Sequence, residues 1–326
     1  MSKDKILTLL EEHKGKILSG NDLSSKLGIS RNAIWKSVNA LRKEGHQITS
    51  IRNRGYVLEL GSDHLSESEI RMHLGESSST HNILILTETP STNTYIKEHK
   101  DLPDNTVVLS NTQTSGRGRL GKTFHSQDQG GIYLSLLKVK ELTKYDTDLA
   151  TLAAAVATAE TLDKVCGTET AIKWVNDLYL NGLKVSGILT EGTIEFESGT
   201  LSSLIIGIGI NVNTERFPEE LEDIATSLYQ VTGKKSVRSE IIGHLLRSLE
   251  EHLRMTKDNP EELLRKYKKR MLYLGEEITI HRGNEIAYGK LMDLSRKGHL
   301  IIESEGKTLT LNSGEISIRK REIRNE

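Results

Sequence analysis

The sequence predicts a multidomain α+β protein. Its 326 residues exceed the usual size of one domain, and 36% of them are hydrophobic, which is ordinary for a chain that folds around apolar cores. Segments with helical periodicity dominate residues 1–45, whereas segments that alternate like strands dominate the middle and the end. We therefore expect a small helical domain, a larger central domain that mixes strands and helices, and a small all-β domain.

Changes in composition indicate the domain limits. Residues 61–80 are rich in Ser, Gly and Glu, which is typical of a linker, and a new strand pattern begins near Asn82. We expect a first domain over residues 1–62 and a linker over 63–80 that contains a short helix. A central domain is expected over 81–270 and a C-terminal domain over 271–326.

The first domain is predicted to be a winged helix-turn-helix. Helices are expected at 4–12 and 23–27, and a third helix is expected to begin after the capping residue Ser30. The alternating segment that follows turns at Asn53-Arg54-Gly55, which indicates a β-hairpin. In this arrangement the third helix enters the major groove of DNA and the hairpin reaches the phosphates.

The charge is divided unequally between this domain and the rest. Residues 1–62 hold 11 Lys and Arg against 6 Asp and Glu, a net charge of +5, which leaves −6 for the remainder. A basic head on an acidic body indicates that only the head meets a polyanion such as DNA. The alternative is a winged helix that docks another protein through a solvated polar face. The residues expected to face DNA are Ser30, Arg31, Asn32, Trp35, Lys36, Asn39, Arg52 and Arg54.

Several classes of protein are excluded. No apolar run approaches the ~20 residues that a membrane span needs, and the charged first segment is unlike a signal sequence. The single cysteine, Cys166, excludes an internal disulfide and a cysteine-based zinc cluster, which suits a reducing compartment. We expect a cytoplasmic protein with no membrane partner.

The central domain is expected to be built on a mostly antiparallel sheet. Strand patterns appear in NILILTE, TVVLSN, GIYLSLLKV, AIKWVND, KVSGILTEG and SLIIGIGINV. A central helix is predicted in ATLAAAVATAETLDKV, and further helices at 237–255 and 261–270. From about Met271 short strands alternate with glycine-rich turns, which indicates a small β-barrel of the SH3 type.

The loop from Thr112 to Thr123 carries three cations and three glycines. Its letters GRGRLGKT satisfy the P-loop pattern, but a P-loop must open a helix, and the next segment, FHSQDQGGIY, has no helical period. We interpret the match as an accident. A cationic loop on a flexible backbone could instead fold over a polyanion, and the alternative is a solvated basic loop.

Two lysines are expected at the same end of the sheet. Lys173 ends a strand, in KWVND, and Lys184 lies on the strand that returns after a tight turn. Beside them, Asn176 and Asp177 offer oxygen atoms that could orient a metal-bound triphosphate. The alternative is a group of ordinary surface charges.

A neutral polar cluster, Ser91-Thr92-Asn93, lies where a strand passes into a helix. It is either a helix N-cap or a set of donors and acceptors for an uncharged polar ligand. The glycines of GIGINV lack the spacing of a dinucleotide fingerprint. They indicate a close approach to the strand backbone instead.

Taken together, the order STN, Q-x-x-GRGRxG, KW-x-ND, K-x-x-GIL and GIGIN resembles the biotin protein ligase family. With the winged helix in front, the chain resembles the bifunctional form that is also a transcriptional repressor. The resemblance covers essentially the whole chain. It implies a ligase that makes biotinyl-5'-AMP from biotin and ATP, and then transfers biotin to a lysine of a biotin carboxyl carrier protein.

The resemblance also implies roles for individual residues. Lys184, Arg119 and Arg117 would carry the catalysis. The residues that would bind biotin and its adenylate are Ser91, Thr92, Asn93, Gln113, Arg117, Gly118, Arg119, Lys184 and Gly187. The residues that would bind the nucleotide are Phe124, Lys173, Asn176 and Asn211, and Asp177 would meet a metal ion.

Two positions depart from the family pattern. Val175 replaces a proline, and Phe124 stands where many members have tryptophan. Valine fits a strand end, and phenylalanine keeps an aromatic wall for adenine. Neither change removes a charged or hydrogen-bonding group, so the departures bear on nucleotide affinity and not on the reaction.

The resemblance implies substrates and partners as well. ATP would enter as its Mg²⁺ complex and biotin as a substrate, with no permanently bound cofactor. The carrier would belong to acetyl-CoA carboxylase, with pyruvate carboxylase as a second candidate. The adenylate-bound chain would form a homodimer on operator DNA. The alternatives are a ligand-sensing repressor without ligase activity, a lipoate ligase and a P-loop ATPase.

Overall fold

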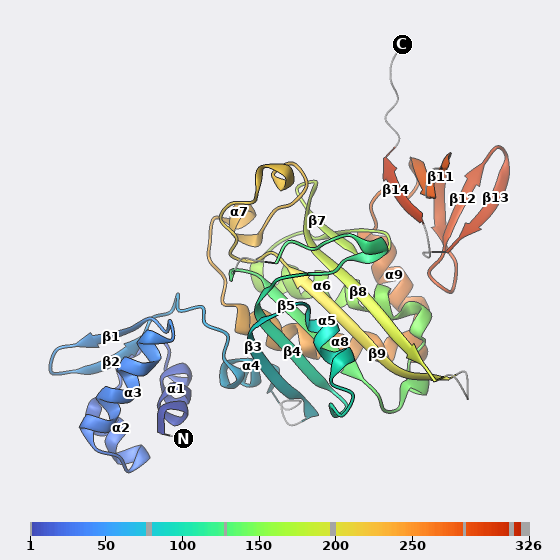
Figure 1. Cartoon of the computed structure of the whole chain (residues 1–326). Coiled ribbons are helices and arrows are strands. Elements are labelled where there is room, and N and C mark those ends of the chain that lie inside the picture. Colours follow the sequence, from blue (N-terminus) through green and yellow to red (C-terminus); the bar gives the residue numbers. More distant parts are fainter. Residues whose placement is uncertain are drawn as a thin grey trace. The chain divides into compact units, whose positions relative to one another are not determined.

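The structure is a computed structural model that describes residues 2–75, 80–126, 129–195, 200–282, 285–312 and 316–320 (Figure 1). The chain divides into two compact units. The first unit contains residues 1–78 and 235–244, and the second contains residues 79–234 and 245–326. Within the described ranges, no helix is both long and apolar enough to cross a membrane.

Three helices and a hairpin form most of the first unit. Ser19 and Ser30 cap the second and third helices, because their hydroxyls accept from the amides of Asp22 and Ala33. Ile34 of the third helix is fully buried in the core that the helices share. The elements are α1 (Ser2–Glu12), α2 (Gly20–Leu27), α3 (Arg31–Lys43), β1 (Ile48–Ile51) and β2 (Gly55–Leu58). The predicted winged helix-turn-helix is confirmed.

The hairpin depends on a glycine at the start of β2. Gly55 has φ +139°, and a Cβ there would lie 2.0 Å from the carbonyl oxygen of Leu18. Backbone hydrogen bonds join this strand to the segment before α2, since the N–H groups of Leu18 and Tyr56 each donate to the other residue's carbonyl oxygen. Only glycine therefore permits the wing to pack against the helices.

A fourth helix and the start of a much later one complete the first unit. Helix α4 (Glu67–Leu74) lies inside the predicted linker, and its Ile70 and Leu74 are buried. Helix α8 (Arg238–Asp258) joins it through Arg238, which donates to both carboxylate oxygens of Asp63. The domain limits predicted at residues 62, 80 and 270 stay predictions.

A seven-stranded sheet forms the centre of the second unit. Its order is β3-β4-β5-β9-β8-β7-β6, and only β3 and β4 run parallel. The strands are β3 (Asn82–Thr89), β4 (Thr106–Gln113), β5 (Ile132–Lys138), β6 (Ala171–Lys173), β7 (Asp177–Leu180), β8 (Leu183–Ile194) and β9 (Leu201–Ile210). The predicted mostly antiparallel sheet is confirmed.

Helices pack against this sheet, as Figure 1 shows. Ile96 of α5 joins a buried cluster with Val108 and Ile205 on one face. Helix α6 is buried along most of its length and packs against β6, β7 and β8. The helices of this unit are α5 (Thr92–Glu98), α6 (Ala150–Cys166), α7 (Leu228–Thr232), most of α8, and α9 (Pro260–Arg270), with 3-10 turns η2 (Arg119–Gly121), η3 (Leu142–Lys144), η4 (Thr147–Leu149) and η5 (Glu219–Leu221).

A small antiparallel sheet follows α9, in the order β13-β12-β11-β10-β14. Trp174, from the segment between β6 and β7, donates its indole N–H to the carbonyl of Gly298 at 3.0 Å. The strands are β10 (Glu277–Arg282), β11 (Glu285–Leu294), β12 (Leu300–Ser304), β13 (Lys307–Leu311) and β14 (Ile316–Lys320). This sheet is the predicted small C-terminal β domain.

An ionic cluster ties three helices of the second unit together. Glu160 on α6 accepts from Lys266 on α9 at 3.1 Å and lies 3.2 Å from the Nε2 atom of His252 on α8. The hydrogen bond from His252 lowers the pKa of Glu160 to about 2, with help from Lys266 and against the effect of burial. The charged carboxylate therefore stabilises this packing.

Glu160→Gln should lower the thermal stability of the second unit at neutral pH and lose this effect in acid. Because the folded pKa of about 2 lies below the ordinary 4.5, the carboxylate stabilises the fold above about pH 4.5, and this contribution disappears as the pH falls towards 2. The unfolding temperatures of the natural chain and of Glu160→Gln, measured between pH 7 and pH 3, give the difference in stability at each pH. Glu251→Gln, at an exposed site on α8, is the control. A difference in unfolding temperature that stays constant down to pH 3 would contradict the stabilising role of the charged Glu160 carboxylate.

Candidate active site and DNA-binding surface

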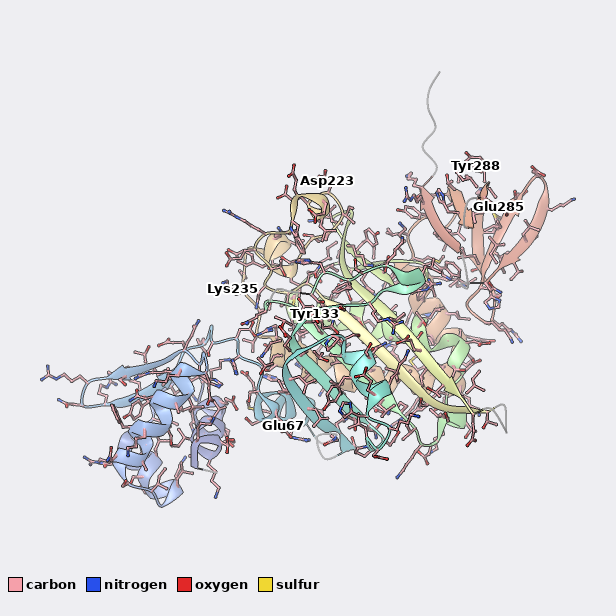
Figure 2. All side chains as sticks on the ribbon, in the orientation of Figure 1. Glu67, Tyr133, Asp223, Lys235, Glu285 and Tyr288 are labelled. Atoms are coloured by element: carbon pink, nitrogen blue, oxygen red, sulfur yellow. The ribbon has the colours of Figure 1, made fainter. Side chains whose placement is uncertain are left out.

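A cavity of about 430 Å³ opens over one face of the central sheet. Its floor includes a row of residues that are paired from strand to strand: Lys173, Asp177, Gly187, Gly209 and Tyr133. Tyr133, labelled in Figure 2, lies on β5 in the middle of this sheet. A cavity of this size is typical of a site for a small molecule.

Two glycines of β9 make room above the floor. Because side chains alternate along a strand, Ile206, Ile208 and Ile210 point to the opposite, buried face. A Cβ at Gly207 would lie 2.3 Å from Asn93 Oδ1, and a Cβ at Gly209 would lie 2.6 Å from the ring of Phe124. The close approach predicted for these glycines is confirmed.

The cavity collects every substrate and nucleotide residue that the sequence predicted. They come from α5, β4, the cationic loop, β6 to β9 and the segments between them. The lining includes Ser91, Thr92, Asn93, Gln113, Arg117, Gly118, Arg119, Phe124, Lys173, Asn176, Asp177, Lys184, Gly187 and Asn211. Their individual roles stay predictions.

One end of the cavity is neutral and polar. Gln113 Oε1 accepts from the backbone N–H of Thr92 at 2.8 Å and from its hydroxyl at 3.2 Å. Ser135 donates towards Thr92 Oγ1 at 2.6 Å and Asn93 Oδ1 at 2.5 Å. Ser135, buried on β5, was missed by sequence reasoning because a single serine in a strand gives no signal. These bonds fix side chains that offer both donors and acceptors.

Ser91 occupies the N-cap position of α5, but its side chain makes no capping hydrogen bond. The N-cap interpretation therefore accounts for its place in the chain and not for its hydroxyl. The side chain is buried and lines the cavity. A hydroxyl with this placement is available to a ligand.

Glu191 on β8 connects the polar end to the cationic loop, and sequence reasoning missed it as well. It accepts from Asn93 Nδ2 at 2.8 Å and from Lys97 at 2.7 Å, and Arg117 Nη1 lies 3.6 Å away. Burial raises the pKa of Glu191, but the hydrogen bonds from Lys97 and Asn93 outweigh it, and the net shift is downward. The charged carboxylate can therefore orient Asn93 and Arg117 together.

The cationic loop closes on itself through its backbone. Gly118 N–H donates to Lys122 at 2.7 Å, and Phe124 N–H donates to Gly116 at 2.9 Å. A Cβ at Gly116 would lie 2.4 Å from the carbonyl oxygen of Phe124, so glycine is required there. A short 3-10 turn and then strand β5 follow Gly118, and the residues that the structure describes between them, 119–126 and 129–131, form no α-helix. The P-loop match is therefore accidental, as predicted.

Positive charge gathers at the other end of the cavity. Asp177 Oδ1 lies 2.6 Å from Lys184 Nζ, and Asp177 is the residue paired with Lys173 across β6 and β7, so both lysines lie near one carboxylate. Arg119 donates to Asn176 Oδ1 at 3.3 Å. Burial lowers the pKa of Arg119 and of Lys173, in each case against the attraction of Asp177.

The described lining has far more cations than carboxylates. Arg117, Arg119, Lys122, Lys173, Lys184 and Arg319 all face the cavity, against the one carboxylate of Asp177. Arg319 lies on β14 of the small C-terminal sheet, and no local pattern could have connected it to this site. A cavity with this excess of positive charge is suited to a polyphosphate beside a neutral polar group.

Asn211 has a structural partner in the cavity wall. Its Nδ2 donates to the carbonyl of Thr226 at 3.0 Å, and its backbone N–H donates to Val185 at 2.9 Å. The amide thus holds the segment that precedes α7 against the sheet. Its predicted contact with a nucleotide stays a prediction.

The first unit presents a polar, basic surface on α3 and the wing. Trp35 is 54% exposed, and Arg31, Asn32 and Lys36 are exposed around it. Arg52 and Arg54 are exposed at the wing, while Ser30 caps α3 and Asn39 accepts from Arg42. An exposed tryptophan among cations is unusual for a solvated face and typical of a contact surface.

Known proteins match the chain in three segments. Residues 3–57 match an HTH domain, residues 86–211 the biotin/lipoate A/B protein ligase family, and residues 273–319 the biotin protein ligase C-terminal domain. The bifunctional ligase/repressor BirA of Bacillus spizizenii is 36% identical over 320 residues, which cover 96% of this chain and 97% of that one. The chain belongs to the biotin protein ligase family, in its bifunctional ligase/repressor form.

Further members of the family support this assignment. The bifunctional ligase/repressor BirA of Bacillus subtilis is 36% identical over 323 residues, covering 96% of this chain and 97% of that one. The solved biotin protein ligase from Aquifex aeolicus in complex with biotin and ATP is 36% identical, with a TM-score of 0.66, over 74% of this chain and 99% of that chain.

Gly207→Ala should weaken biotin binding by about 10- to 100-fold, because moving Asn93 leaves buried polar groups unpaired. Calorimetric titration of biotin measures the effect. Gly192→Ala on β8 is the control, since the close contact of its Cβ would be with the flexible end of Leu201, and the backbone oxygen of Ser203 would lie at an ordinary 3.7 Å. Unchanged affinity in Gly207→Ala would remove Asn93 from the biotin site.

Proposed function

We propose that the chain joins biotin to ATP as biotinyl-5'-AMP, transfers biotin to a lysine of a carrier protein, and represses transcription as an adenylate-bound dimer. The similarity to bifunctional ligase/repressors over 96% of the chain carries this proposal. The cavity agrees with it, because a neutral polar end adjoins a strongly cationic end. The whole-chain match to biotin ligases also speaks against a lipoate ligase.

The first step brings together two anions that repel each other, and the cations of the cavity would neutralise their charges. The biotin carboxylate attacks the α-phosphorus of ATP, the bond to pyrophosphate breaks, and a mixed anhydride forms. Lys184, beside Asp177, would neutralise the carboxylate and the α-phosphate, while Arg117 and Arg119 would hold the phosphates. ATP would enter as its Mg²⁺ complex, and Asp177 is the carboxylate of the described lining that could meet that ion.

The neutral end would hold the ureido ring of biotin. Ser91, Thr92, Asn93 and Gln113 would supply donors and acceptors for a group that needs both when it is buried. Phe124, whose ring lies over Gly209, would form the wall for adenine. Lys173, Asn176 and Asn211 would bind the nucleotide, and Gly187 would let the ligand approach the strand.

In the second step a lysine amine of the carrier attacks the acyl carbon, and AMP leaves. The carrier would be the biotin carboxyl carrier of acetyl-CoA carboxylase, and pyruvate carboxylase would be a second source. Consumption of the adenylate by the carrier would compete with dimerisation and DNA binding. These partners would place the chain in the cytoplasm.

The ligase is tested by mixing the full chain with ATP, Mg²⁺, biotin and an apo-carrier domain. One biotin added to the carrier, with one AMP released, is expected. Lys184→Gln should slow the reaction by about 100-fold or more, as loss of a charge that stabilises the transition state does. Lys164→Gln, exposed at the end of α6, should react like the natural chain.

The alternatives give different products. Neither AMP nor a change in carrier mass would mean a ligand-sensing repressor without ligase activity. ADP in place of AMP would mean an ATPase. Either outcome would overturn the ligase proposal.

The repressor is tested on DNA from upstream of the organism's own biotin biosynthetic genes. In filter binding with biotin and ATP present, Trp35→Ala and Lys36→Ala should each weaken the complex by about tenfold, because both side chains are exposed on α3. Lys144→Ala, exposed in the second unit, is the control. Equal affinity in all four proteins would mean that α3 does not contact the operator.

A further inference from the structure

Three side chains of metal-binding type meet in the first unit, outside the cavity. His73 comes from α4, and Glu240 and His244 come from the first two turns of α8. Their ligand atoms all lie within 4.8 Å of one another, and each residue is half-buried. We call these residues the two-helix cluster. Glu67, in the first turn of α4, is labelled in Figure 2 and locates this helix.

A glycine brings the two helices close enough for the cluster to form. A Cβ at Gly243 would lie 2.5 Å from His73 Cβ and 2.8 Å from the carbonyl oxygen of Ile70. A larger residue would push α4 away and separate its histidine from the other two ligands. The rings of His73 and His244 are 5.9 Å apart between centroids.

The frame around the cluster is fixed on both sides. Arg238 donates its backbone N–H and its Nε to Asp63 at 2.9 and 2.8 Å, one turn or less before Glu240. Ser66, the N-cap of α4, donates its backbone N–H to Ser239 Oγ at 3.4 Å. Ile70 of α4 is fully buried. The cluster therefore lies on a braced helix pair and not on a loop.

We infer that the two-helix cluster binds a divalent cation of the zinc class. Glu240 and His244 are four residues apart, so they project from the same side of α8, towards His73. Two imidazoles and one carboxylate suit Zn²⁺, with a fourth position left for water, and do not suit Mg²⁺ or Ca²⁺, which prefer oxygen ligands. With bonds of about 2.0–2.1 Å, the ligand atoms of a tetrahedral site lie about 3.3 Å apart, so binding would draw these three atoms closer together than the separations of up to 4.8 Å seen here.

The bound ion would join α4 to α8. The sequence places α4 between the wing and the second unit, and α8 continues from the first unit into the second. A cation held by both helices would stabilise the packing of residues 235–244 against the rest of the first unit, because it binds the two helices when they are packed together and not when they are apart. This inference does not depend on the proposed ligase activity.

The test uses the full chain, without a histidine tag and freed of metal. Calorimetric titration with Zn²⁺ at pH 7.5 should show one site that depends on the cluster. His73→Ala, His244→Ala and Glu240→Gln should each lower its affinity for Zn²⁺ by at least about tenfold, because loss of a residue that only hydrogen-bonds to a metal ligand already costs that much. His99→Ala, exposed in the second unit, should leave this site unchanged.

A second measurement on the natural chain does not depend on how the variants fold. Diethylpyrocarbonate labelling read by mass spectrometry should show that Zn²⁺ protects His73 and His244, while His99 keeps its reactivity. Equal labelling of His73 and His244 with and without saturating Zn²⁺ would overturn the inference. So would a titration in which the three cluster variants bind Zn²⁺ as tightly as the natural chain.

Discussion

The alternation of isoleucine and glycine along β9 is the constraint on which the site depends. Ile206, Ile208 and Ile210 hold the strand in the core, while Gly207 and Gly209 leave the other face bare. Asn93 and Phe124 occupy the space above those two glycines. Because this strand must carry large side chains on one face and none on the other, it tolerates few amino-acid substitutions. Any side chain at either glycine would displace a group that lines the cavity.

Electrostatics divides the cavity into two ends. At one end hydroxyls and amides satisfy one another through Gln113 and Ser135, so this region can be buried without charge. At the other end cations from the loop, β6, β8 and β14 converge, and burial makes their charge costly until an anion arrives. Glu191 bridges the ends, since it contacts Asn93 and lies near Arg117. Order in the loop and order in the polar end are thus physically connected.

The sequence predicted the elements well because the patterns were local. The caps Ser19 and Ser30, the turn at Gly55 and the alternation of β9 each depend on a few neighbouring residues. Ser135, Glu191 and Arg319 were missed because their importance comes from the register of strands distant in the chain. For the same reason, the linker pattern at 61–80 could not reveal that α4 packs against residues that follow Lys234.

The discontinuity of the first unit bears on how the chain is made. The three helices and the wing share a core formed by residues 6–58, so this part can fold soon after it leaves the ribosome. Helix α4 can contact α1 and the residues just after it at that stage, as in the ion pair of Lys14 and Glu69, but its second packing surface, around Arg238 and Gly243, is synthesised only after the whole central sheet. The basic head thus exists early, but the packing of α4 against α8 is completed only after the seven strands of the central sheet have been translated.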